Sequence, residues 1–174
     1  MEYKLIIPNG KEVAHSSNLS YEALASVLNS HPDTKDNADF FEIMADHPAS
    51  YVRETVAYKD RLNKATVDKL ASDSSINVLR NLSRSAAFRE FASSEMVERL
   101  LNLDVEIAQN IANNLEGFEQ CDIGKLATIL SLHGDLGVLS ALAGAYNAPK
   151  KVLKTLAAHS DPYVAFQAKN TLGL

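Results

Sequence analysis

The sequence contains a single cysteine, no tryptophan and few residues that interrupt helices. Its 174 residues include only seven glycines and five prolines, as is usual for helices joined by short turns. Cys121 alone cannot form an internal disulfide or a multi-cysteine zinc or iron–sulfur site. We therefore expect Cys121 to be a small, half-buried apolar residue.

The chain also lacks a long uncharged apolar stretch. Its longest apolar region, residues 123–145, is interrupted by Lys125, His133, Gly134 and Asp135, whereas a membrane-spanning helix needs about 18 or more apolar residues in succession. Residues 1–13 contain no apolar run of signal-peptide length. We therefore expect a cytoplasmic protein without a membrane partner.

The charge is acidic overall but unevenly distributed. A net charge of −5 argues against general affinity for nucleic acid, because neutralising phosphates requires clustered Lys and Arg. Residues 1–52 and 90–123 carry −5 and −7, whereas residues 53–89 and 124–174 carry +4 and +3. In a protein built from stacked repeats, these blocks would become bands along the surface.

Two apolar phrases alternate along the chain. The first has apolar residues at positions i and i+4, usually followed by a small residue, at residues 52–57, 78–83, 107–112, 138–143 and 164–169. The second places an apolar residue three after a branched or apolar one, at residues 40–45, 67–71, 97–101, 123–127 and 153–157. Both spacings stack apolar side chains on one helix face.

The regular spacing of these phrases predicts a repeat of helix pairs. Starts of the first phrase are 26, 29, 31 and 26 residues apart. Such self-similarity at 20–50 residues is typical of repeat architectures. We expect a seam of buried residues between successive helices, formed by Leu70, Leu82, Leu100, Ile111, Leu126, Leu142 and Leu156.

Similar polar turns connect the two kinds of phrase. They occur at residues 30–33, 46–48, 72–75 and 159–162, and combine His, Ser, Asp and Pro. Asp and Ser can cap the next helix, and Pro is tolerated in its first turn. The histidines recur with the turn instead of converging in sequence, so we interpret them as solvated or capping residues, and not as metal ligands.

The chain resembles the leucine-rich repeat variant and HEAT-like superfamily. His47-Pro48 with Val52-Arg53, and Leu70-Ala71 before Asp73, carry the resemblance, which covers about residues 38–172. It implies an all-α fold, a right-handed α-solenoid of about four to five helix-pair repeats. The spacing is longer than the variant's usual two dozen or so residues and shorter than the roughly 40 of a HEAT unit. One member of the variant family carries an iron–sulfur module, which a chain with one cysteine cannot hold.

Ahead of the repeats, the N-terminus predicts a short β-hairpin. Residues 3–7 form a β-type run, 8–10 are a turn signal and 11–14 form a second strand. We divide the chain into this hairpin or cap (residues 1–17) and a helical repeat domain (residues 18–174). The hairpin either caps the repeat array or recruits a partner strand.

After the hairpin, a first helix is expected to begin at Asn18 or Ser20. Its apolar stripe would be Leu24, Val27 and Leu28. Residues 31–39 are interpreted as a solvated loop because they are rich in Asp, Lys and Asn.

Motifs that carry chemistry are missing from the sequence. It has no Gly-rich phosphate loop, zincin motif or EF-hand loop. Glu95 and Glu98 share a helix face, but in a charged segment such a pair is usually solvated surface. We therefore expect no enzymatic activity, no catalytic residues, no metal site and no cofactor.

The sequence best fits a non-enzymatic protein-interaction scaffold or regulatory binding protein that uses one face of a short solenoid. The partner would be another protein, and a homodimer through the open end of the array is a further possibility. If the second-phrase helices line the binding face, its polar positions are Asp68, Lys69, Glu95, Glu98, Arg99, Lys125, Lys150, Lys151 and Lys154.

An alternative follows from the HEAT-like resemblance. That superfamily includes DNA alkylation-repair glycosylases, which bind duplex DNA along a basic face. The short basic blocks could contact a few phosphates at most. A basic binding candidate parallel to the three lysines is formed by Arg80, Arg84 and Arg89, on a first-phrase helix and its continuation. The acidic block at residues 90–123 would repel a duplex that crosses all the repeats, so nucleic acid is the less favoured partner.

Overall fold

A computed structural model describes the backbone of residues 4–9 and 12–174 and the side chains from residue 18 onward. Strands β1 (Lys4–Asn9) and β2 (Glu12–Asn18) pair antiparallel, with a register shift between Ile7 and Pro8. Residues 1–3 and 10–11 lie outside the described residues. The capping and strand-recruiting roles of this segment stay predictions.

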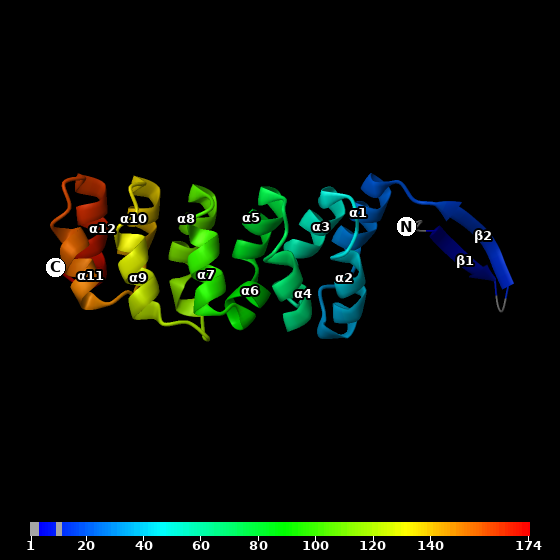
Figure 1. The fold of residues 1–174 in the computed structure, drawn as a ribbon, viewed down its shortest axis with the longest axis horizontal. Coiled ribbons are helices and arrows are strands. Elements are labelled where there is room, and N and C mark those ends of the chain that lie inside the picture. Colours follow the sequence, from blue (N-terminus) through cyan, green and yellow to red (C-terminus); the bar gives the residue numbers. More distant parts are fainter. Residues whose placement is uncertain (1–3, 10–11) are drawn as a thin grey trace.

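The rest of the described chain is helical, which confirms the expected helical class (Figure 1). No helix in the described part of the chain is long and apolar enough to cross a membrane. In chain order the α-helices are α1 (Tyr21–Ser30), α2 (Ala38–Met44), α3 (Ser50–Ala57), α4 (Lys64–Leu70), α5 (Ile76–Arg84), α6 (Ala86–Phe91), α7 (Ser94–Leu101), α8 (Val105–Asn113), α9 (Ile123–Ser131), α10 (Leu136–Gly144), α11 (Lys150–Ala157) and α12 (Pro162–Leu172).

Alternate helices pack side by side along the long axis of the molecule (Figure 1). Helix α1 contacts α3, and the contacts continue in order through α5, α8, α10 and α12. We call these six helices the first row. The other helices follow a parallel course, in which α2 contacts α4, α4 contacts α6, and α9 contacts α11, with the 3₁₀ turn η2 (Leu115–Gly117) between α6 and α9.

Most helices begin at a side chain that accepts a backbone N–H of the first turn. Ser or Asn does so before α1, α4, α6 and α7, and Asp does so before α8, α9, α10 and α12. Each cap satisfies a donor that has no partner inside the helix. Helix α12 ends at Gly173, whose φ of 75° lies in the left-handed region that favours glycine.

The predicted seam belongs to the hydrophobic core of the molecule. Leu70, Leu82, Leu100, Ile111, Leu126, Leu142 and Leu156 are all buried. The first residue of each first phrase is buried as well. These five residues, which all lie on first-row helices, are Val52, Val78, Ile107, Val138 and Val164. The spacing of apolar residues therefore correctly identified the buried face of these helices.

Three local expectations were wrong. Val27 is exposed, because the buried face of α1 consists of Leu24, Ala25 and Leu28. Residues 31–39 are not a loop throughout: a 3₁₀ turn, η1 (Lys35–Asn37), leads into α2 at Ala38. The sequence reading also missed α6, which buries Phe88 edge-on against Phe118, with ring centroids 5.7 Å apart.

Candidate functional site

An exposed apolar residue stands at the start of every first-row helix. Each is the first or second residue of its helix, and each exposes between 36% and 59% of its surface. The six residues are Tyr21, Tyr51, Ile76, Val105, Leu136 and Tyr163, and we call them the apolar row. Because the first-row helices pack in order, the row follows one long edge of the molecule.

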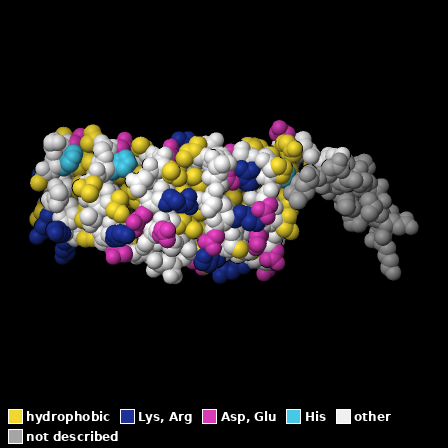
Figure 2. All heavy atoms as spheres, in the orientation of Figure 1, with side chains coloured by type: hydrophobic (Ala, Val, Ile, Leu, Met, Phe, Trp, Pro, Cys, Tyr) yellow, Lys and Arg dark blue, Asp and Glu magenta, His cyan; other side chains and the backbone are white. Residues whose placement is uncertain are grey.

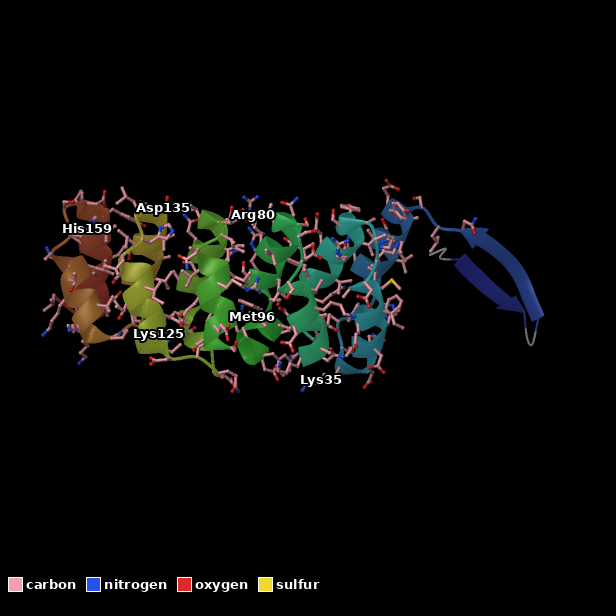
Figure 3. The ribbon with its side chains drawn as sticks, in the orientation of Figure 1. Lys35, Arg80, Met96, Lys125, Asp135 and His159 are labelled. Atoms are coloured by element: carbon pink, nitrogen blue, oxygen red, sulfur yellow. The ribbon has the colours of Figure 1, made fainter. Side chains whose placement is uncertain are left out.

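Histidine side chains form hydrogen bonds within the turns before α3, α10 and α12. Nδ1 of His133 accepts the backbone N–H of Asp135, and Nδ1 of His159 accepts that of Asp161, both at 3.0 Å. His47 makes the same contact with the N–H of Ala49 at 3.1 Å. Figure 3 shows Asp135 and His159 at the same edge of the molecule.

The expectation for the histidines is confirmed only in part. His47 and His159 cap their turns, whereas the His31 ring packs against Phe40, with ring centroids 4.8 Å apart. His47 is buried and not solvated, and its burial lowers the pKa of the imidazole. Among the described residues, no group of three His, Cys, Asp or Glu side chains is placed to hold a metal ion.

Polar side chains connect successive first-row helices just below this edge. On α5, Arg80 donates through Nε and Nη2 to both carboxylate oxygens of Asp104, the capping residue of α8, at 3.0 and 2.7 Å. These hydrogen bonds lower the pKa of Asp104. On α8, the Gln109 amide donates to Asp135, the capping residue of α10, at 3.2 Å.

A second arginine–carboxylate fork joins α3 to the turn before α5. Arg53 donates through Nε and Nη2 to Asp73 at 2.6 and 2.9 Å, and through Nη1 to the carbonyls of His47 and Pro48. Burial alone would raise the pKa of Asp73, but the hydrogen bonds from Arg53 and from backbone N–H groups hold that pKa below its ordinary value.

A pocket of about 670 Å³ opens between α8, α10 and α12. Its floor on α10 consists of small residues, among them Ser140, Ala141 and Gly144. A Cβ atom added at Gly144 would meet nothing within 4 Å, so the space beside it is open. Gly137 is different, because the Gln109 amide approaches it so closely that a Cβ there would lie 2.2 Å from Nε2.

Polar groups around the pocket come from three helices. Gln109 and Asn113 belong to α8, Asp161 caps α12, and Tyr163 and Gln167 follow on α12. None of the residues that line the pocket is basic. Leu136 and Tyr163 of the apolar row form part of the same lining. The C-terminal end of the row therefore combines exposed apolar surface with a concave acidic and amide-rich site.

Several charged residues predicted for the binding face instead pair with neighbours. Lys69 contacts Asp46 at 2.6 Å, and Lys125 contacts Glu98 at 2.6 Å, which raises the pKa of Lys125. Both pairs join neighbouring helix pairs. Two further members of the predicted face are also engaged, since Asp68 pairs with Lys64 at 2.5 Å within α4 and Arg99 donates to the carbonyl of Ala71 at 2.9 Å.

The remaining members of that face project into solvent. Glu95 on α7 and Lys150, Lys151 and Lys154 on α11 are exposed. Basic side chains gather at the α11 end of the face shown in Figure 2. Besides Glu95, the structure thus leaves three exposed lysines on α11, which we call the lysine patch, as the part of the predicted face that is open to a partner.

The three arginines of the parallel basic candidate are each engaged within the protein. Arg80 binds Asp104 and lies 3.3 Å from Glu106, and Arg84 pairs with the other oxygen of Glu106. Arg89 donates to the carbonyl of Arg84 at 2.8 Å. A phosphate would have to compete with carboxylates already in place at Arg80 and Arg84.

Cys121 is half-buried, as expected. Its thiol donates to the carbonyl of Ala92 at 3.3 Å, and burial raises the pKa of that thiol. A raised pKa disfavours the thiolate, which is the reactive form of cysteine.

Sequence reasoning missed both the apolar row and the pocket. A signal for the row was present, because an apolar residue lies one or two positions before each first-phrase residue, as Tyr51 does before Val52. The pocket depends on which small residues of α10 face α12, and that requires the packing of the two helices.

Comparison of the chain with models of protein families, with curated proteins and with solved structures finds no match.

Proposed function

We propose that the chain is a non-enzymatic protein-interaction scaffold, built as a short right-handed solenoid of the leucine-rich repeat variant or HEAT-like kind. The ordered packing of α1, α3, α5, α8, α10 and α12 supports this architecture. In a solenoid, equivalent positions of successive repeats form a continuous surface suited to an extended partner.

The observation that carries the proposal is the apolar row. Isolated exposed apolar residues are ordinary on protein surfaces, but contiguous patches mark interaction sites. Here one apolar residue occupies the same place at the start of each first-row helix, and Tyr contributes three of the six. Tyrosine is enriched in the cores of protein interfaces, because it buries a large area with little loss of conformational entropy.

The experiment compares two tyrosines at opposite ends of α3. Tyr51 belongs to the apolar row, whereas Tyr58 follows the last residue of the helix, and they are exposed to similar extents. Immobilised full-length chain is used to capture proteins from a lysate of the source cells, with and without nuclease. We expect Tyr51→Asp to reduce recovery of the partner at least tenfold, and Tyr58→Asp to leave it within twofold.

A third variant tests the lysine patch, the alternative surface. The triple reversal Lys150→Glu, Lys151→Glu and Lys154→Glu is expected to retain the partner if the apolar row binds it. Loss of capture in this variant, together with full capture by Tyr51→Asp, would assign binding to α11. Capture that disappears on nuclease treatment would contradict the proposal and favour nucleic acid.

A further inference from the structure

The side-chain hydrogen bonds to a capping Asp that connect α5 to α8 and α8 to α10 have no counterpart between α10 and α12 among the described residues. Two residues after the buried Val or Ile, α5 carries Arg80 and α8 carries Gln109, and both side chains reach the capping Asp of the next helix. On α10 the same position is Ser140, and the capping residue of α12 is Asp161. No side chain among the described residues donates a hydrogen bond to the Asp161 carboxylate, and no described cation pairs with it.

Asp161 uses only one of its carboxylate oxygens for capping. Oδ1 accepts the backbone N–H groups of Tyr163 and Val164, each at 3.0 Å. Oδ1 of Asp104 likewise accepts two N–H groups, those of Glu106 and Ile107, while its Oδ2 accepts Nη2 of Arg80 at 2.7 Å. Oδ2 of Asp161 is the corresponding atom at the pocket.

The pocket beside Asp161 has the size and polarity to receive a cation with several N–H donors. Its volume is about 670 Å³ and no basic residue lines it. Ser140, Asn113 and Gln167 contribute hydroxyl and amide oxygens, which are hydrogen-bond acceptors. Ala141 and Gly144 provide a low apolar floor against which an aliphatic stem could pack.

We propose that this pocket binds an arginine side chain of the partner protein, whose guanidinium pairs with Asp161 as Arg80 pairs with Asp104. The inference rests on the proposed scaffold function and specifies the chemistry of its partner. Arg53 and Arg80 show that this chain already binds guanidinium groups with forked geometry between successive first-row helices. A planar fork with five donors matches a carboxylate flanked by amide oxygens, whereas a lysine ammonium offers only a point charge.

The direct test uses a small probe and the full-length protein. Backbone amide resonances of the ¹⁵N-labelled chain are followed during titration with Nα-acetyl-L-arginine amide. We expect saturable shifts at Gly144, Tyr163 and Gln167, with a Kd in the millimolar range. The neutral isostere Nα-acetyl-L-citrulline amide should produce no saturable shifts, and Nα-acetyl-L-lysine amide should bind at least tenfold more weakly.

Two substitutions test the site from opposite directions. Asp161→Asn keeps a good capping residue for α12 while removing the charge, and it should weaken arginine binding at least tenfold. Ser140→Arg places a guanidinium where α5 carries Arg80, so it should abolish binding of the probe while raising Tm. Asp122→Asn removes a charge from the capping residue of α9, away from the pocket, and should leave binding unchanged.

The outcomes separate this inference from the proposed function. Equal shifts with arginine and citrulline amides, or unchanged binding by Asp161→Asn, would overturn the arginine site. If Tyr51→Asp still abolished partner capture, the scaffold function would stand without it. Conversely, if the pocket bound the arginine probe but Tyr51→Asp did not reduce capture of the partner, the arginine site would be supported and the role of the apolar row refuted.

Discussion

Replacing Leu82 by alanine is expected to lower the free energy of unfolding by about 2–5 kcal/mol. Leu82 is fully buried on α5, which lies between α3 and α8 in the first row. The truncation removes apolar contacts on both sides and leaves a cavity that the surrounding helices can fill only in part. Equilibrium unfolding in urea or guanidinium chloride, monitored by circular dichroism, measures the loss.

The matched control is Leu132→Ala. Leu132 follows the end of α9 and is 82% exposed, so the same truncation should change the free energy of unfolding by less than about 0.5 kcal/mol. Equal effects of the two substitutions would contradict the packing described for α5. A change in the denaturant slope would instead indicate that the array unfolds in more than one step.

The buried seam could be predicted because helical packing imposes a period on the sequence. Apolar residues at i and i+4 must lie on one face of a helix, so phrases such as the one beginning at Val78 identify the buried stripe without knowledge of its neighbours. The capping role of Asp135 and Asp161 can also be predicted from the local sequence. Each accepts N–H groups within the next three residues, and a local contact of this kind can be read from the sequence.

The sequence did not show which residues of the predicted charged face form ion pairs, because most of those ion pairs connect residues of different helix pairs. Lys69 and Asp46 are 23 residues apart in the chain, yet their side chains meet at 2.6 Å. Nothing in the local sequence distinguishes such a lysine from Lys154, which stays exposed. Only the stacking of the helices decides which charges are paired and which are open to a partner.

The apolar row and the pocket were not predicted, because both depend on how neighbouring helices pack. An apolar residue in the first turn, such as Leu136, looks like part of the buried stripe, and its exposure depends on where the neighbouring helix ends. The pocket lies where α10 carries the short Ser140 at the position that Arg80 and Gln109 occupy on α5 and α8, and this comparison requires the packing of the helices. The apolar row is a feature that all six first-row helices share, whereas the pocket depends on a difference between α10 and the helices before it.

Replacing Arg53 by methionine is expected to destabilise the protein by about 3 kcal/mol at neutral pH, the lower end of the range for removing one partner of a buried ion pair. The side chains of Arg53 and Asp73 are only 15% and 6% exposed. Methionine retains much of the aliphatic volume but leaves the Asp73 carboxylate buried without its cation. Two backbone carbonyls, those of His47 and Pro48, also lose a donor.

The difference between wild type and Arg53→Met should depend on pH in a defined direction. The folded-state pKa of Asp73 lies below its ordinary value, so the stabilisation is complete above the unfolded-state pKa, about 4. It is lost as the pH falls through the lower folded-state pKa. In the variant the carboxyl group lacks the cation and protonates at higher pH. The gap in stability should therefore be largest near neutral pH, begin to shrink as the pH falls through the folded-state pKa of the variant, and be smallest below the folded-state pKa of the wild type.

Lys64→Ala is the appropriate comparison, because it also breaks an ion pair. Lys64 and Asp68 lie one turn apart on α4 and both are largely exposed, so water and salt already screen their attraction and its loss should cost less than about 1 kcal/mol. Salt at 0.5 M should reduce this small effect further, whereas the Arg53→Met difference should persist because the forked pair is shielded from solvent. If both variants lost stability equally, or if the Arg53→Met gap grew at low pH, Asp73 would not be the anion that Arg53 stabilises.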